Sequence, residues 1–148
     1  MEIKFTKEQY ENLLKLAYLG NWMINAIRTD DKIEKYDDIA HYIYSFAKDV
    51  GLEKYIEYDT EMNQFFPTMQ FEEDTDIHQY IDDYEAENFW SELIDRLARR
   101  DLIKEYGEDA VRKMSFEVIL EKEQPFIEKY EREFEEFGIE RLEVKDRL

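Results

Sequence analysis

Residues 6–28 read TKEQYENLLKLAYLGNWMINAIR and contain the clearest helix signal of the chain. Thr6 is a favourable N-cap residue, and Gln9 stands three residues later, where it can complete a capping box. Phe5 precedes the cap and can pack on Tyr10 as a hydrophobic staple. This pattern predicts a helix that begins directly after Thr6 and continues to residue 28.

The same helix is apolar over most of its circumference from Leu13 onward. A helix with so little polar surface is expected at the centre of the fold, with Trp22 in the core. Asn21 and Asn25 lie one turn apart on it. They form either a polar site or, in the more ordinary interpretation, a pair of amides whose hydrogen bonds are satisfied by their neighbours.

Helical periodicity returns several times after residue 28. A second helix is predicted over residues 38–49, with Asp37 as its N-cap and Gly51 in the left-handed position that ends it. Further helical patterns begin near residue 75 and cover residues 86–106, 108–114 and 115–138. Pro125 interrupts the last of these, because proline lacks the N–H that a helix interior needs, so a kink or two separate helices are expected there.

The helix expected over residues 86–106 places most of its acids before its bases. Glu92 with Arg96 and Asp95 with Arg99 have the i,i+4 order that favours ion pairs on a helix surface. Leu93 lies on the apolar face of this helix and is expected in the core.

These elements predict an all-α protein, a single irregular helical bundle of about five to six helices in one domain over residues 1–148. An irregular acidic and aromatic loop is expected over residues 57–74, where helical periodicity disappears. The two ends of the chain alternate weakly between apolar and polar residues, which would allow a minor two-stranded pairing of the termini. The apolar residues of that pattern are Ile3, Phe5, Leu142 and Val144.

The composition argues against several classes of function. The chain has no cysteine, so disulfides, cysteine-ligated metals and thiol catalysis are excluded. No nucleophile elbow, phosphate-binding loop or dinucleotide motif is present, so no catalytic residue and no cofactor is predicted. The net charge of −18 disfavours direct binding to nucleic acid or to a membrane, because those contacts use Lys and Arg. With no recognisable secretory signal or membrane-spanning run, a cytoplasmic protein of undefined oligomeric state is expected.

Negative charge is concentrated in residues 55–95, which contain thirteen acids and no Lys or Arg. Because aromatic residues are interspersed with these acids, the stretch predicts a folded negative surface for a basic protein partner, in its sharpest form a nucleic-acid mimic. The residues expected to contact the partner are Glu57, Asp59, Glu61, Phe65, Phe66, Phe71, Glu72, Glu73, Asp74, Asp76, Asp82, Asp83 and Glu85. Glu131, Glu133 and Glu135 alternate with bases near the C-terminus and are expected to matter much less.

Two other interpretations remain open. Asp37 with His41 and Asp74 with His78 each have the spacing that places both side chains on one face of a helix. Two such helices facing each other would give a small metal-dependent helical-bundle enzyme with two histidine and two carboxylate ligands. In the other interpretation the acids only keep the protein soluble, as acidic surfaces commonly do.

Overall fold

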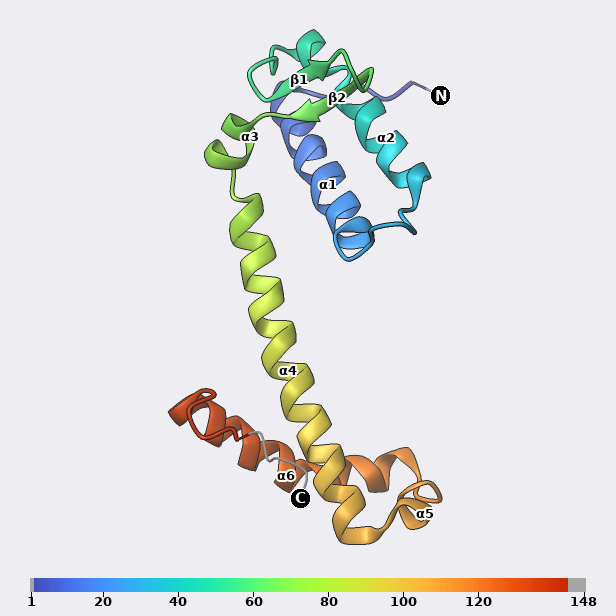
Figure 1. Cartoon of the computed structure of the whole chain (residues 1–148), viewed down its shortest axis with the longest axis vertical. Coiled ribbons are helices and arrows are strands. Elements are labelled where there is room, and N and C mark those ends of the chain that lie inside the picture. Colours follow the sequence, from blue (N-terminus) through green and yellow to red (C-terminus); the bar gives the residue numbers. More distant parts are fainter. Residues whose placement is uncertain (1, 144–148) are drawn as a thin grey trace. The chain divides into compact units, whose positions relative to one another are not determined.

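The computed structural model describes residues 2–143 (Figure 1). Over this range the chain forms six α-helices, one short 3₁₀ helix and one two-stranded antiparallel sheet, which confirms a mainly helical protein. It divides into two compact units, unit 1 (Met1–Asp82) and unit 2 (Asp83–Leu148). The single bundle therefore stays a prediction.

Helix α1 (Lys7–Asn25) begins as the sequence predicts. The Thr6 hydroxyl accepts a hydrogen bond from the Gln9 backbone N–H at 3.2 Å, and the Gln9 side chain accepts one from the Thr6 N–H at 2.9 Å. The Phe5 and Tyr10 rings meet edge to face with their centroids 5.9 Å apart. The capping box and the hydrophobic staple are therefore both confirmed.

Only one side of α1 is covered in unit 1. Leu14 is fully buried, whereas Leu16 and Met23 are 67% and 52% exposed. The expectation of a helix buried on most sides is wrong, because within unit 1 the helix packs mainly on α2 and the short 3₁₀ helix. Trp22, which was expected in the core, is only half-buried.

Helix α2 (Glu34–Tyr44) lies beside α1 and is followed by the 3₁₀ helix η1 (Ala47–Val50) (Figure 1). Gly51 ends η1 with a φ of 71°, the left-handed conformation that the sequence predicts. Helix α2 starts four residues earlier than predicted, and Ile33 rather than Asp37 stands at its N-cap position. The Asp37 side chain, freed from capping, joins the polar network described below.

The segment expected to be an irregular loop contains a β-hairpin. Strands β1 (Ile56–Asp59) and β2 (Gln64–Pro67) pair antiparallel, and β2 packs against α2. The Asp59 carboxylate accepts hydrogen bonds from two backbone N–H groups of the connecting turn, at 2.8 and 2.9 Å. Asn63 adopts a φ of 55°, a conformation that Asn tolerates better than most residues. The loop prediction is wrong here because strands this short give no recognisable alternation.

Two helices follow the hairpin. Helix α3 (Met69–Asp74) begins at Thr68, whose hydroxyl accepts from the Phe71 N–H at 3.2 Å, and it directs Phe71 into the core, where the side chain is fully buried. Helix α4 (Ile77–Tyr106) continues through both of the helical patterns that the sequence separates at residue 86.

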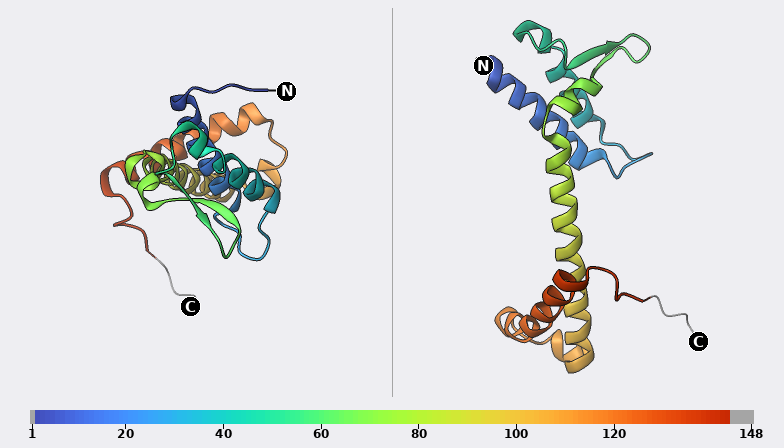
Figure 2. Two further views of the ribbon diagram at one scale, coloured as in Figure 1. Left: turned by 90° about the horizontal axis from the view of Figure 1, so that it is seen from above. Right: turned by 90° about the vertical axis from the view of Figure 1, so that its left-hand side faces the viewer.

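Unit 2 consists of the second part of α4, the short helix α5 (Glu108–Val111) and helix α6 (Phe116–Phe137). Figure 2 shows α6 crossing α4, and Ala98, Tyr130 and Phe134 are buried where these two helices pack. Leu93 is half-buried against this cluster. Pro125 lies inside α6, which is one continuous helix rather than the two that Pro125 would allow.

The expected pairing of the chain ends does not form among the described residues. Ile3, Phe5 and Leu142 lie outside any strand, and Val144 lies outside the described residues. The pairing of β1 with β2 is the only sheet of residues 2–143, so the small sheet is an internal hairpin.

Candidate functional site

Two of the predicted partner-binding acids are neutralised by lysines from outside residues 55–95. Asp74 Oδ2 lies 2.8 Å from the Lys54 Nζ, and Asp76 Oδ1 lies 3.5 Å from the Lys15 Nζ. The hydrogen bond from Lys54 holds the pKa of Asp74 below its usual value. The local absence of bases in the sequence is therefore partly compensated in the fold.

Other members of the predicted set have structural roles. Phe71 belongs to the core, and Asp59 fixes the hairpin turn. The Glu72 carboxylate accepts a hydrogen bond from the Tyr18 hydroxyl at 3.1 Å, and its other oxygen lies 3.3 Å from the His78 Nε2. Burial together with the Glu72 charge raises the pKa of Tyr18 to about 12.

The remaining predicted acids are exposed and form no ion pair with another described residue. They are Glu57, Glu61, Glu73, Asp82, Asp83 and Glu85. Phe65 and Phe66 in β2 are half-buried, and Tyr84 in α4 is 49% exposed. Of the negative surface that the sequence predicts, these six carboxylates and the exposed parts of the three aromatic side chains remain.

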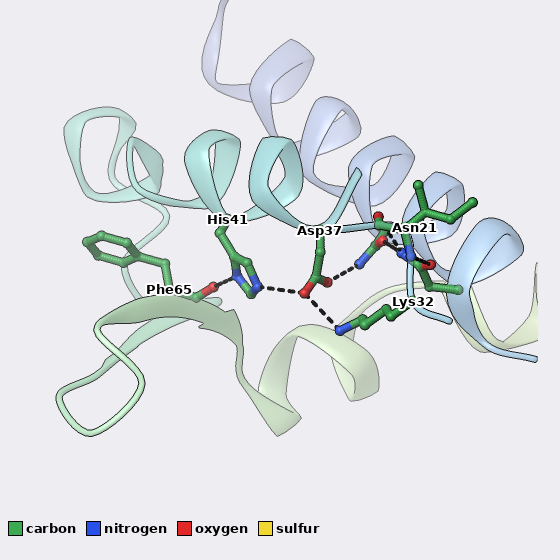
Figure 3. Close-up of polar contacts among 7 residues, drawn as sticks. Asn21, Lys32, Asp37, His41 and Phe65 are labelled. Carbon is green, nitrogen blue, oxygen red and sulfur yellow. Dashed lines mark hydrogen bonds and ion pairs between the residues drawn. The ribbon is translucent and has the colours of Figure 1, made fainter. Parts of the chain in front are cut away.

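Asp37 and His41 meet on one face of α2, as their spacing predicts (Figure 3). The His41 Nε2 lies 3.5 Å from Asp37 Oδ2, and the His41 Nδ1 lies 2.6 Å from the carbonyl oxygen of Phe65. Because a carbonyl oxygen can only accept, Nδ1 carries a proton and donates to it. This contact ties α2 to the hairpin.

The Asp37 carboxylate accepts hydrogen bonds from two donors. The Asn21 amide donates to Oδ1 and the Lys32 ammonium to Oδ2, both at 2.8 Å (Figure 3). Burial alone would raise the pKa of Asp37, but the hydrogen bonds from Lys32 and Asn21 outweigh it and lower the pKa. The carboxylate is therefore a charged, well-positioned acceptor.

The two asparagines of α1 form a connected pair. The Asn25 amide donates to the Asn21 side-chain oxygen at 2.8 Å, and the Asn25 oxygen accepts from the Ile33 backbone N–H at 2.9 Å. Asn25 thereby fixes the turn between α1 and α2. This agrees with the interpretation of the pair as amides whose hydrogen bonds are satisfied by their neighbours. Asn21 connects this turn to Asp37, so the pair also supports a polar site.

The four expected metal ligands do not come together. Asp74 is paired with Lys54 and His78 with Glu72, whereas Asp37 and His41 contact the residues described above. Among residues 2–143, no three His, Asp or Glu side chains converge where they could share a metal ion. The geometry needed for the metal-dependent alternative is therefore not formed by the described residues.

A pocket of about 340 Å³ opens beside this network; it is named here the Asp37 pocket. Its polar lining is Asn21, Asn25, Lys32, Asp37 and His41, and the rest of its lining is mainly aromatic: Tyr18, Trp22, Tyr44 and Phe66, with Ala26 and Pro67. The sequence analysis singles out Asn21, Asn25, Asp37 and His41, but it does not single out Tyr44 of α2 or Lys32 in the turn before α2.

A groove of about 440 Å³ lies between α4 and α6 in unit 2; it is named here the α4–α6 groove. Its apolar residues are Trp90, Ile94, Ile127 and Phe134, and the Trp90 and Phe134 ring centroids lie 5.5 Å apart. Its other lining residues are exposed: Ser91 and the four acids Glu87, Asp95, Glu131 and Glu135.

The four carboxylates of the α4–α6 groove have no ionic partner among the described residues. The sequence prediction missed Glu131 and Glu135, which it grouped with bases that are neighbours only along the chain. Glu133 differs from them, because Arg141 pairs with it at 3.1 Å. Helical spacing would have placed Glu131 and Glu135 on one face with Ile127, but not opposite Glu87.

No helix of the described part of the chain combines the length and apolar character needed to cross a membrane. No protein-family model, no curated protein and no solved structure matches the chain.

Proposed function

We propose that the protein is an acidic binding module that accepts a basic, amphipathic segment of a partner protein in the α4–α6 groove. The supporting observation is the set of four carboxylates, Glu87, Asp95, Glu131 and Glu135, that surround an apolar floor without any ionic partner among the described residues. Free carboxylates on one groove attract a cationic ligand, and the exposed part of the apolar floor gains from being covered.

A helix is the form of partner that suits this groove. The apolar residues come from two facing helices, Trp90 and Ile94 from α4 and Ile127 and Phe134 from α6. Such a surface matches a stripe of apolar residues at helical spacing, the common mode in which amphipathic helices dock into grooves. Lysines or arginines beside that stripe would lie over the carboxylates.

A neighbouring hollow makes the charge at the two ends of the α4–α6 groove different. It shares Asp95 and Ile127 with the α4–α6 groove and is otherwise lined by Arg96, Arg99, Leu120 and Glu123. Two arginines therefore lie beyond one end of a groove whose other end carries Glu87, Glu131 and Glu135. We expect a bound helix to place its most basic end toward these glutamates.

The exposed acids elsewhere would raise the rate at which a basic partner arrives. Asp82, Asp83 and Glu85 on α4 and Glu57, Glu61 and Glu73 in unit 1 form no ion pair among the described residues, so they add to the net negative charge that attracts a cationic partner. In the sharpest form of this proposal the partner is a nucleic-acid-binding protein, because such proteins carry clustered Lys and Arg.

The test uses a Lys/Leu amphipathic peptide of about 14 residues, roughly four helical turns, and a Glu/Leu peptide of the same pattern. The protein has two tryptophans, so its ¹H–¹⁵N spectrum has two indole signals. The Trp90 signal should shift saturably with the Lys/Leu peptide and much less with the Glu/Leu peptide. The Trp22 signal, from unit 1, is the internal control. Salt should weaken the binding, since exposed charges are screened.

The decisive variant replaces Glu87, Glu131 and Glu135 by Gln and Asp95 by Asn. Its affinity for the Lys/Leu peptide should fall about tenfold, since exposed charge pairs contribute roughly 0.2–1 kcal/mol each. The matched control removes the same charge from exposed acids of unit 2 that line neither hollow: Asp109, Glu121, Glu136 and Glu140. Equal losses in both variants, or equal binding of both peptides, would exclude the groove as a site for basic partners.

A further inference from the structure

The Asp37 pocket contains a buried hydroxyl without a partner. Tyr44 is only 4% exposed, lines the pocket, and forms no hydrogen bond through its hydroxyl with any described residue. Every fully enclosed side-chain nitrogen or oxygen of the described residues has a hydrogen-bond partner. The Tyr44 hydroxyl therefore keeps some accessible surface, and Tyr44 is one of the residues that line the pocket. Buried tyrosine hydroxyls normally find a partner, so this one is available to a ligand.

The same hydroxyl stays protonated over a wide pH range. Burial, with the nearby Tyr18 and Asp37 adding to it, raises the pKa of Tyr44 well above its ordinary value. A neutral hydroxyl can both donate and accept a hydrogen bond. Tyr44 thus offers one donor and one acceptor to whatever occupies the pocket.

Asp37 offers a fixed acceptor in the same pocket. Its carboxylate accepts hydrogen bonds from Asn21 and Lys32, which uses two of about four acceptor positions. These two hydrogen bonds hold the carboxylate in place, so a ligand would not have to order it. The Lys32 ammonium offsets its charge at 2.8 Å, which favours an uncharged ligand over a cation.

The rest of the pocket suits a flat ring. Trp22, Phe66 and Tyr18 line it together with Tyr44, from α1, β2 and α2. Its volume of about 340 Å³ is close to the lower end of the range for small-molecule sites, roughly 300–1,000 Å³. A ligand with one or two rings fits that space, and aromatic walls favour a planar one.

We propose that the Asp37 pocket binds a small, flat, uncharged nitrogen heterocycle of the nucleobase type, which donates an N–H to Asp37 and hydrogen-bonds with the Tyr44 hydroxyl. An adjacent N–H donor and carbonyl or ring-nitrogen acceptor is the pattern that these two groups recognise. This site is independent of the α4–α6 groove, which lies in the other unit.

The test follows the two tryptophan indole signals of the whole protein during titration with four free bases: uracil, cytosine, adenine and hypoxanthine. The Trp22 signal should shift saturably with at least one base, whereas the Trp90 signal should not move. 1,3-Dimethyluracil, which keeps the ring and the carbonyls of uracil but has no N–H, and toluene, which has only the apolar ring, are the matched probes. If uracil binds, dimethyluracil should bind about tenfold more weakly, the loss expected for one hydrogen bond to a charged group.

Tyr44→Phe tests the hydroxyl with almost no change in shape. It should weaken base binding about tenfold while leaving the melting temperature close to that of the parent. Tyr42→Phe is the control, since Tyr42 lies on the same helix but is 60% exposed and does not line the pocket. The proposal is overturned if no base shifts the Trp22 signal up to about 10 mM, a concentration well above typical site affinities. It is also overturned if toluene binds as tightly as the bases, or if Tyr44→Phe and Tyr42→Phe behave alike.

Discussion

Arg99 of α4 holds the carboxylate of Glu123 in α6, with its Nη2 2.9 Å from Oε2 and its Nε 2.8 Å from Oε1. Helical spacing predicts that Arg99 pairs with Asp95 instead. Glu123 is only 6% exposed, and a buried carboxylate needs a charged partner far more than an exposed one does. The choice of Glu123 leaves Asp95 free on the α4–α6 groove. One ion pair thus both joins the two helices and sets the charge of the proposed site.

Arg99→Ala should therefore lower the free energy of unfolding by about 1–3 kcal/mol, because it leaves Glu123 buried and unpaired. Urea denaturation followed by circular dichroism measures this change. Arg96→Ala is the matched control: Arg96 pairs with Glu92 on the exposed side of the same helix, 2.9 Å apart, and its loss should cost less than about 0.5 kcal/mol.

The double variant Arg99→Ala with Glu123→Gln separates the loss of the ion pair from the cost of leaving the Glu123 charge buried and unpaired. Removing the carboxylate charge as well should recover part of the lost stability, because the unpaired charge is no longer present. If Arg99→Ala costs no more than Arg96→Ala, the pair with Glu123 does not stabilise the helix packing.

The parts of the structure that sequence predicts well depend on residues close along the chain. The capping box of Thr6 and Gln9, the left-handed Gly51 and the ion pair of Glu92 with Arg96 all follow from spacings of a few residues. Pairings across the fold do not follow in this way. Lys15 neutralises Asp76 although 61 positions separate them, and no local pattern indicates it.

In the two candidate sites, too, the sequence predicts contacts between residues close along the chain but not contacts between distant ones. The spacing of Asp37 and His41 predicts their contact, but not the hairpin that brings Phe65 to His41. The acids of residues 55–95 are evident in the sequence, whereas the groove adds Glu131 and Glu135 from another helix. Composition also fails to separate buried from exposed aromatics, which is why Phe71 was expected on the surface and is found in the core.

Leu14 and Leu16 of α1 provide a test of its one-sided burial. Leu14→Ala should destabilise by about 2–5 kcal/mol, because the fully buried side chain would leave a cavity. Leu16→Ala should change stability by less than about 0.5 kcal/mol, since Leu16 is 67% exposed. Thermal unfolding of both variants measures the difference. Similar losses would mean that the outer face of α1 is covered in solution.

Pro125 offers a route to a more stable protein. It lies inside α6 and is exposed, so its ring contributes little to packing. Proline in a helix interior removes one backbone hydrogen bond and costs about 3 kcal/mol relative to alanine. Pro125→Ala should therefore raise the free energy of unfolding by about 1–3 kcal/mol in urea denaturation. Gln124→Ala, at the neighbouring exposed position, should change it by less than about 0.5 kcal/mol. A loss of stability in Pro125→Ala would show that the proline is needed for the shape of α6.

Asp101 should make stability depend on pH in the acidic range. Its side chain is only 15% exposed, and burial by itself would raise its pKa. Hydrogen bonds from Tyr130, Arg100 and Lys129 outweigh that effect and lower the pKa far below the ordinary value of 3.8. A depressed folded-state pKa stabilises the protein above the unfolded-state pKa, and this contribution is lost as pH falls toward the folded-state value.

The free energy of unfolding of the parent should therefore exceed that of Asp101→Asn by a constant amount above about pH 5, and the difference should shrink below about pH 4. Urea denaturation at a series of pH values measures it. Asp109→Asn is the control, because Asp109 is exposed, has no ion pair among the described residues, and its replacement removes the same charge. Subtracting the control corrects for the general relief of repulsion in so acidic a protein. A corrected difference that stays the same from pH 7 to pH 3 would mean that Asp101 gains nothing from its three donors.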